Sequence, residues 1–143
     1  SIDRRPGLDE LALKLSNLKP NSDALENCVG YAKAGYQRHV IKKNDFYELA
    51  IICWKPGQKT PIHDHVGSDC AFLIISGTST ETIYETNYNG LAFPTESIIR
   101  KSGEICAAEE QDIHVVSNEG DIGLVELHVY TPPLSGYNVY SSM

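Results

Sequence analysis

From about residue 36 onward, the chain consists of short runs rich in β-branched, aliphatic and aromatic residues, separated by Gly, Pro, Asn and Asp. The runs read QRHVIKK, FYELAIICW, CAFLIIS, TSTETIYE, ESIIRKS, EICAAE, IHVVSN and GLVELHVY. Asn44-Asp45 separates the first two runs, which favours a hairpin at that point. Many short strands with turn residues between them are typical of an antiparallel sandwich or barrel. We therefore expect an all-β barrel over residues 35–143.

The first 34 residues have a different pattern. Four leucines recur at helical spacing and Pro20 ends that helix, while Asn21-Ser22-Asp23 offers an N-cap for a second helix near residues 23–33. The leucines are Leu8, Leu11, Leu15 and Leu18. A chain of 143 residues is one domain on its length alone. We expect residues 1–34 to form two short helices that pack on the barrel.

Composition excludes several classes of protein. The formal net charge of −7 argues against binding to a nucleic-acid backbone, which needs a basic surface. No apolar run approaches the roughly 20 residues of a membrane-spanning helix. The four cysteines form no CxxC pair, so we expect thiols rather than a disulfide framework, in a reducing cytoplasm. Cys28, Cys53 and Cys106 are interpreted as core residues, and no oligomeric state is predicted.

The segment His63-Asp64-His65 is the first candidate for chemistry. Residues i and i+2 of a strand point to the same face, so the two imidazoles would stand side by side. Two imidazoles that face one point are a chelating pair for a transition metal. A pair of surface histidines with no metal is the structural alternative.

The spacing around this pair resembles the two cupin motifs. Gly57 is followed after five residues by His63-Asp64-His65, after four more by Cys70, and after six more by Gly77. Gly103 is followed after ten residues by His114, and after three more by Asn118. Three positions differ from the usual cupin pattern. Cys70 stands where many cupins have a metal-binding Glu, and Glu109 and Gln111 stand where Pro and Gly are usual.

Three separated segments are similar to the cysteine dioxygenase family of thiol dioxygenases. They are Tyr36-Gln37-Arg38, the segment ICWKPGQKTPIHDHVGSDC, and LHVYTPP at 127–133, where Thr131 replaces the usual Ser. The resemblance covers roughly residues 36–134. It implies a small cupin jelly-roll barrel that binds Fe(II).

The resemblance also implies a role for each residue that matches. His63, His65 and His114 would be the iron ligands, although His128 competes with His114 for the third position. Arg38 would hold a substrate carboxylate, because a guanidinium can bind a carboxylate through two hydrogen bonds, and Tyr36 would assist it. The alternative for Arg38 is a surface residue.

Glu126, His128 and Tyr130 alternate along GLVELHVY and therefore share one face of a strand. In the family, His128 orients the phenol of Tyr130 near the iron, and the usual residue at 126 is Ser. Cys70 and Tyr130 match a pair that forms a thioether crosslink in animal members. The structural alternatives are a solvent-exposed polar face for this strand and a small buried cysteine at position 70.

The expected reaction is the addition of both atoms of O2 to a thiol sulfur. The substrate would be a small thiol acid, with L-cysteine converted to cysteine sulfinate as the first expectation. Two alternatives stay open: another small thiol acid such as 3-mercaptopropionate, and a non-catalytic metal-binding cupin that acts as a sensor or binding module.

Overall fold

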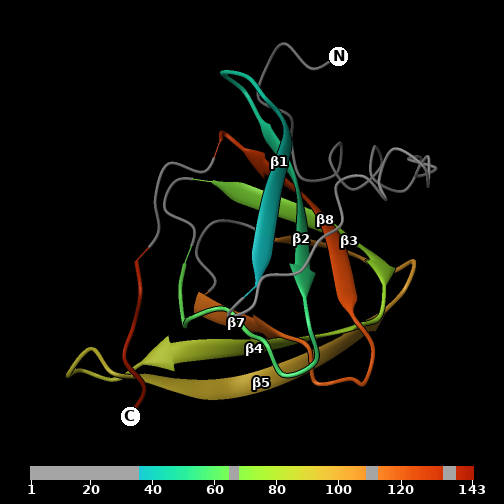
Figure 1. The fold of residues 1–143 in the computed structure, drawn as a ribbon. Coiled ribbons are helices and arrows are strands. Elements are labelled where there is room, and N and C mark those ends of the chain that lie inside the picture. The colour runs from blue at the N-terminus through green and yellow to red at the C-terminus, as the bar shows by residue number, and fades with distance from the viewer. Residues whose placement is uncertain (1–35, 65–67, 109–112, 134–137) are drawn as a thin grey trace.

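The computed structural model describes residues 36–64, 68–108, 113–133 and 138–143 (Figure 1). The two helices expected within residues 1–34, and their packing on the barrel, lie outside these ranges and stay predictions. In the described part of the chain, no helix has the length and apolar character that crossing a membrane requires.

The described residues contain eight strands, one for each run identified in the sequence. They are β1 (Gln37–Lys43), β2 (Glu48–Trp54), β3 (Asp69–Ser76), β4 (Thr78–Thr86), β5 (Ala92–Lys101), β6 (Ile105–Ala108), β7 (Ile113–Ser117) and β8 (Leu124–Thr131). The fifth strand begins four residues before the run ESIIRKS. Its first residue, Ala92, pairs with Thr86 and also bridges to Ser142 near the end of the chain.

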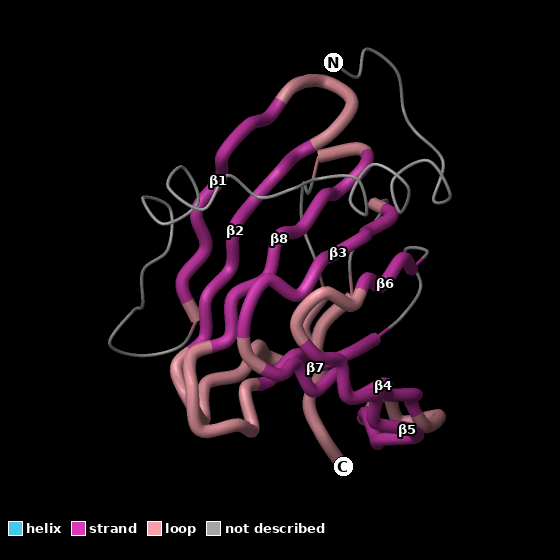
Figure 2. The backbone as a smooth tube through the Cα atoms, turned by 90° about the vertical axis from the view of Figure 1, so that its right-hand side faces the viewer, coloured by secondary structure: helices cyan, strands magenta, loops and turns pink. Residues whose placement is uncertain are grey.

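The strands form two antiparallel sheets, as Figures 1 and 2 show from two sides. The larger sheet has the order β1-β2-β8-β3-β6, and the smaller has the order β5-β4-β7. Cupins share this double-sheet architecture, so the structure confirms the all-β fold class expected from the sequence.

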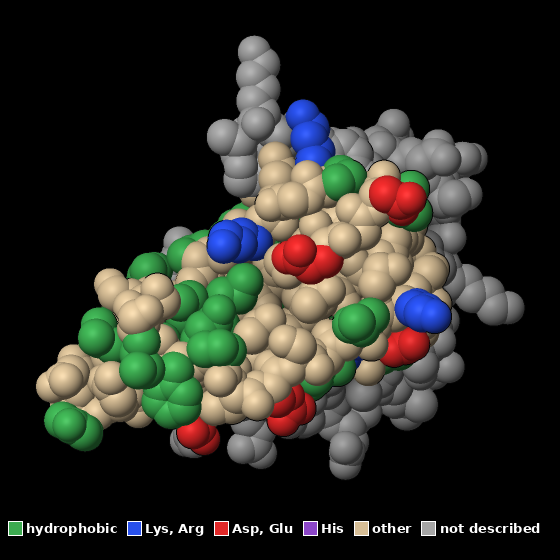
Figure 3. All heavy atoms as spheres, turned by 90° about the horizontal axis from the view of Figure 1, so that it is seen from below, with side chains coloured by type: hydrophobic (Ala, Val, Ile, Leu, Met, Phe, Trp, Pro, Cys, Tyr) green, Lys and Arg blue, Asp and Glu red, His purple; other side chains and the backbone are tan. Residues whose placement is uncertain are grey.

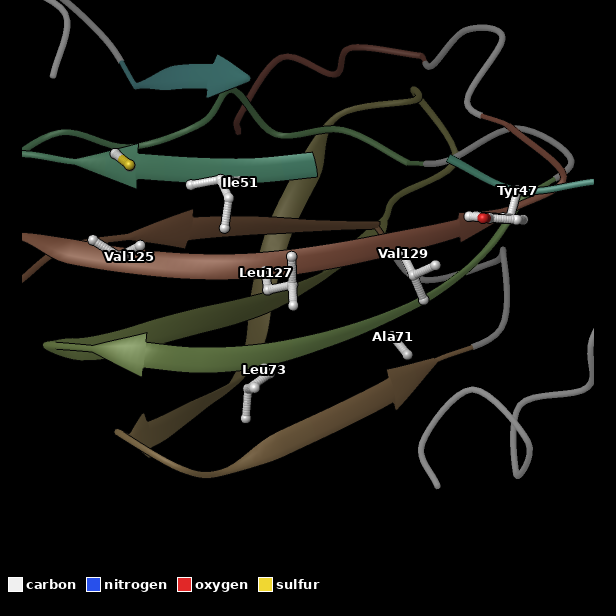
Figure 4. Packing of buried hydrophobic residues seen from close by; sticks show 8 residues of the cluster. Tyr47, Ile51, Ala71, Leu73, Val125, Leu127 and Val129 are labelled. Carbon is white, nitrogen blue, oxygen red and sulfur yellow. The ribbon is translucent and has the colours of Figure 1, made fainter. Parts of the chain in front are cut away.

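Strand β8 lies at the centre of the larger sheet, and all eight of its residues are buried. Because side chains alternate along a strand, β8 contributes to a packed layer on each face of the sheet. One layer contains Ile51, Leu127 and Val129 (Figure 4). The other includes Phe72 of β3 and Val116 of β7, and therefore joins the two sheets.

Local turns explain how the chain changes direction. Asn44 caps the β1–β2 hairpin, because its side-chain oxygen accepts hydrogen bonds from the backbone N–H groups of Phe46 and Tyr47. Gly77 is the single residue between β3 in the larger sheet and β4 in the smaller one. It has a φ of 85°, and a Cβ at this position would lie 2.4 Å from the carbonyl oxygen of Gly123. Only glycine fits this crossing between sheets.

The side of the molecule seen from below carries a group of hydrophobic side chains at one end, with acidic and basic side chains dispersed over the rest (Figure 3). Among the described residues, Tyr88 in the β4–β5 loop and Met143 are the most exposed large hydrophobic residues. The charged and titratable groups discussed below are mostly inside the barrel instead.

Candidate functional site

A cavity of about 170 Å³ lies inside the barrel and is lined by residues from both sheets. The lining residues are Tyr36, Arg38, Ile52, Trp54, Thr60, His63, His114, Val116, His128 and Tyr130. The cavity is smaller than the roughly 300–1,000 Å³ of pockets for drug-sized ligands, so it fits a molecule of few non-hydrogen atoms. Six of the residues singled out from the sequence therefore line one space.

His63 and His114 meet through their backbones. His63 N donates to His114 O at 3.0 Å, and His114 N donates to His63 O at 2.8 Å. This antiparallel bridge puts the two rings on the same side, with centroids 4.7 Å apart. Residues that are 51 positions apart in the chain are thus brought together as a pair of buried imidazoles.

The Nδ1 atom of each ring is held by a hydrogen-bond acceptor. His63 Nδ1 donates to the carbonyl oxygen of Pro61 at 2.8 Å, and His114 Nδ1 donates to Glu81 Oε2 at 2.6 Å. With the proton on Nδ1, the lone pair is on Nε2, which is the nitrogen that can bind a metal. Burial and the neighbouring His114 lower the pKa of His63 to about 4, so its ring is neutral at pH 7.

Glu81 is shared between His114 and a cation. Arg100 Nη1 donates to Glu81 Oε1 at 2.6 Å. Burial by itself would raise the pKa of Glu81, but the hydrogen bond from His114 and the ion pair with Arg100 hold it below its ordinary value. Arg100 also lies over the ring of Phe72, which stacks on His128 with centroids 4.9 Å apart. One set of contacts thus fixes His114 and supports His128.

The C-terminal segment fixes the loop that carries His63. Asp64 accepts hydrogen bonds from the backbone and side-chain nitrogens of Asn138 and from the hydroxyl of Tyr140. Although partial burial raises the pKa of Asp64, these donors outweigh that effect and lower it. The residue between the two predicted ligands is therefore an anchor for the loop.

The third predicted ligand, His65, lies outside the described residues. Within residues 36–64, 68–108, 113–133 and 138–143, no group of three or more His, Cys, Asp or Glu side chains is arranged to hold a metal ion. The structure thus describes two of the three predicted ligands, and the position of His65 stays a prediction.

The polar face of β8 is buried, which excludes the solvent-exposed alternative. Glu126 is fully buried and its Oε1 accepts a hydrogen bond from His128 Nε2 at 2.6 Å. On the other side of the ring, Nδ1 lies 3.3 Å from the Tyr130 hydroxyl. Because both nitrogens of His128 already contact protein groups, these contacts favour His114 as the ligand over its competitor.

Cys70 and Tyr130 are direct partners in the β3–β8 register. Both side chains contact His128 Nδ1. Cys70 Sγ lies 3.7 Å from this nitrogen, and the Tyr130 hydroxyl is its other contact. Burial raises the pKa of the Cys70 thiol well above its ordinary value, with smaller contributions from Cys106 and Glu126. Burial and the neighbouring Cys70 likewise raise the pKa of the Tyr130 phenol. Both groups therefore hold their protons at neutral pH.

Arg38 lines the cavity, and its guanidinium carbon lies 5.8 Å from the centroid of the Tyr130 ring. It forms an ion pair with Glu48, whose side chain is only 2% exposed. Tyr36 also lines the cavity and packs against Trp54, with ring centroids 5.8 Å apart. The predicted anion-binding residue thus already has a carboxylate partner within the protein.

Glu48, Glu81 and Arg100 are site residues that sequence reasoning missed. The sequence feature that could have identified Glu48 is its position on the same strand face as the apolar residues Ile52 and Trp54, where a carboxylate is unusual. Glu81 shares its strand face with buried Ser79. Among the remaining histidines and cysteines, His39 is exposed. Cys53 is buried in the core, as expected. Cys106 is half-buried, and Cys28 lies outside the described residues.

Comparison with known proteins identifies the family. A family model described as cysteine dioxygenase type I matches residues 9–143. The chain belongs to the cysteine dioxygenase type I family. This confirms the family resemblance inferred from the sequence, and extends it toward the N-terminus.

Curated members of the family align with part of this chain. The cysteine dioxygenase type 1 of Homo sapiens is 28% identical over 103 residues, which is 68% of this chain and 52% of the human protein. That of Danio rerio is 25% identical over 111 residues, or 73% of this chain and 55% of the fish protein. The chain thus spans about half the length of the curated relatives it matches.

Solved structures confirm the fold. A protein of Klebsiella pneumoniae with a double-stranded β-helix domain superposes with a TM-score of 0.65 at 19% identity, over 82% of this chain and 95% of the other. An oxalate decarboxylase of Lactobacillus farciminis gives a TM-score of 0.62 at 18% identity, over 80% of this chain and 34% of the other. At these identities both inform on the fold alone.

The donors at the site fit ferrous iron, the metal that the resemblance implies. Neutral imidazoles suit iron, and ligand histidines usually donate their other N–H to a carbonyl or carboxylate. His63 and His114 have this arrangement through Pro61 and Glu81.

We expect His63→Ala to abolish iron binding, because the remaining imidazoles hold ferrous iron poorly. Elemental analysis of protein reconstituted with Fe(II) measures this directly. His39→Ala removes an exposed histidine of β1 and is the matched control, which should retain the iron of the unaltered protein. Full iron occupancy in the His63 variant would contradict the assignment of this ligand.

We expect Glu81→Ala to weaken Fe(II) affinity by roughly 10–100-fold, because His114 loses the acceptor that fixes its tautomer and orientation. Glu81→Gln retains an acceptor oxygen and should lose less. Glu85→Ala, on the exposed part of the same strand, is the control. Competition with a coloured Fe(II) chelator measures the affinity, and equal affinity in all three variants would exclude a positioning role for Glu81.

Proposed function

We propose that this chain is a non-haem iron dioxygenase that adds both atoms of O2 to the sulfur of a small thiol and releases a sulfinate. Family membership supports this class of reaction. The observation that carries the proposal is the pair His63–His114, which lines a small cavity together with the phenol of Tyr130. L-cysteine is the first candidate substrate, and 3-mercaptopropionate is the second.

His63, His65 and His114 would hold the iron in this proposal. When bound, ferrous iron supplies open coordination positions for a thiolate and O2 and the redox chemistry that joins them. Three neutral imidazoles bring no negative charge, so an anionic thiolate is the natural ligand to offset the charge of the metal. The sulfur provides the electrons that reduce O2, and no further reductant is required.

Tyr130 would provide an O–H group beside the substrate. Its pKa is raised by burial, so the phenol keeps its proton, and its hydroxyl oxygen can accept a hydrogen bond at the cavity that it lines. His128 and Glu126 would fix the position of that hydroxyl through their hydrogen-bonded chain. Tyr36 and Arg38 would contact the part of the substrate remote from sulfur.

A small thiol and O2 would be the partners of the protein, and we propose a reducing compartment such as the cytoplasm. Among the described cysteines, Cys53, Cys70 and Cys106 carry thiols rather than disulfides, which agrees with such a compartment.

We expect the iron-loaded protein to consume O2 and a thiol in equal amounts and to form a sulfinate. An oxygen electrode with L-cysteine, 3-mercaptopropionate and cysteamine measures uptake, and mass spectrometry with labelled O2 tests whether both product oxygens come from it. A protein that binds iron and a thiol but consumes no O2 would instead be a non-catalytic metal-binding cupin that acts as a sensor or binding module.

We also expect Cys70 and Tyr130 to form a thioether slowly during turnover. Forming the C–S bond removes one hydrogen from each residue, with O2 as the electron acceptor. Intact mass should therefore fall by about 2 Da, and a denaturing gel should show a faster band because the loop between the two residues is closed.

Cys70→Ala should lack this band, whereas Cys106→Ala, which removes a half-buried thiol of the neighbouring β6, should retain it. An unchanged mass and a single gel band after prolonged turnover would exclude the crosslink. The proposed iron ligands would be unaffected by that result.

A further inference from the structure

Residues 62–64, which carry the proposed ligand His63 and form the ligand loop, are paired along both edges. On one edge, the backbone of His63 exchanges two hydrogen bonds with His114 of β7. On the other edge, His63 bridges to Val139, with flanking hydrogen bonds of 3.1 and 2.9 Å. These bonds run from Asp64 N to Asn138 O and from Tyr140 N to Ile62 O. The C-terminal segment thus lies beside the ligand loop as a further strand.

The same segment pairs on its opposite edge with the first residue of β5 (Figure 1). Ala92 N donates to Ser141 O at 2.8 Å, and Met143 N donates to Ala92 O at 2.9 Å. Because the backbone groups of an extended chain point alternately to its two sides, residues 138–143 bond the ligand loop and β5 at once. Strand β5 belongs to the smaller sheet, so the segment ties the ligand loop to the sheet that carries His114.

Side chains reinforce this pairing at Asp64. Its Oδ2 accepts a hydrogen bond from the Tyr140 hydroxyl at 2.7 Å and another from Asn138 Nδ2 at 3.2 Å. Its Oδ1 accepts one from Asn138 N at 3.0 Å. Hydrogen bonds to an ionised acceptor are the strong ones, and the contact with the phenol is the shortest of the three. Asp64 lies between two proposed iron ligands, so a shift of its backbone would displace both imidazoles.

We propose that Tyr140 is a positioning residue of the iron site, and that the C-terminal segment and the metal stabilise each other. This rests on the proposed function, in which His63, His65 and His114 hold the iron, and deepens it. A metal bound by three imidazoles requires the ligand loop in one position, and the paired segment provides that position. Because coupling of this kind is reciprocal, a segment that raises iron affinity is itself held more firmly when iron is bound.

Tyr140→Phe removes only the hydroxyl that donates to Asp64, and it retains the ring and the backbone pairing. Fe(II) affinity should fall by about three- to tenfold, at the low end for a lost hydrogen bond to a charged group because Asp64 is only half-buried. Competition with a coloured Fe(II) chelator in the absence of O2 measures this affinity. Tyr88→Phe makes the same change on a tyrosine that is 99% exposed, and should leave the affinity unchanged.

The hydroxyl of Tyr140 acts through Asp64, so the effects of the two residues should not add. Asp64→Ala should itself weaken Fe(II) binding, and Tyr140→Phe should cause no further loss when it is combined with Asp64→Ala. A tyrosine that only stabilised the fold, without acting on the ligand loop, would instead add its own loss in the double variant.

The reciprocal effect is measured on the unaltered protein and needs no variant. Amide hydrogen exchange, followed by mass spectrometry, compares the iron-free and the Fe(II)-loaded forms without O2. Exchange in residues 138–143 should slow by about threefold or more on loading, because the metal holds the loop to which they are bonded. A peptide from the turn of the β1–β2 hairpin at Asn44 is the internal control, and its exchange rate should not change.

Three results would overturn the proposal. These are an Fe(II) affinity of Tyr140→Phe within about twofold of the unaltered protein, a further loss in the double variant, or unchanged exchange in residues 138–143 on loading. Failure of the dioxygenase function is distinguishable, because it appears as absent O2 uptake with every thiol, whereas the affinities and exchange rates require neither O2 nor thiol. An unaltered protein without Fe(II) in elemental analysis would overturn the iron ligands and this proposal together.

Discussion

A buried carboxylate needs a partner inside the protein, because water cannot solvate its charge there. The barrel contains three such groups among its described residues: Glu48, Glu81 and Glu126, each no more than 2% exposed. Each contacts a different group of the candidate site. Glu48 pairs with Arg38, Glu81 with His114 and Arg100, and Glu126 with His128. The site is held in place by these three contacts.

The position of β8 makes this arrangement possible. It pairs with β2 along one edge and with β3 along the other. Its two faces point to different layers of the barrel. Val125, Leu127 and Val129 face the apolar layer, while the polar residues between them face the cavity side. The same register brings Cys70 opposite Tyr130. A shift of one residue would exchange the two faces and put the polar residues into the apolar layer.

The smaller sheet makes a different contribution, because it supplies a proposed ligand and its support together. His114 of β7 bridges to the loop at His63, and Glu81 on the neighbouring β4 accepts the outer N–H of its ring. Arg100 on β5 completes the set by pairing with Glu81. Each of the three strands of this sheet thus provides one member, so the orientation of His114 depends on correct pairing of the whole sheet.

The amino-acid sequence by itself determined the eight strands, the two imidazoles and the alternation of polar residues along β8, because these depend on local spacing and period. It also identified the family through motifs at fixed intervals. Only the tertiary structure decided that Glu48 neutralises Arg38, that Glu81 supports His114, and that the polar face of β8 is buried. Alternation assigns a side chain to a face but does not say which distant strand lies opposite it. The pairing of buried charges depends on register and on the crossing between sheets, and both are fixed only when the whole barrel closes.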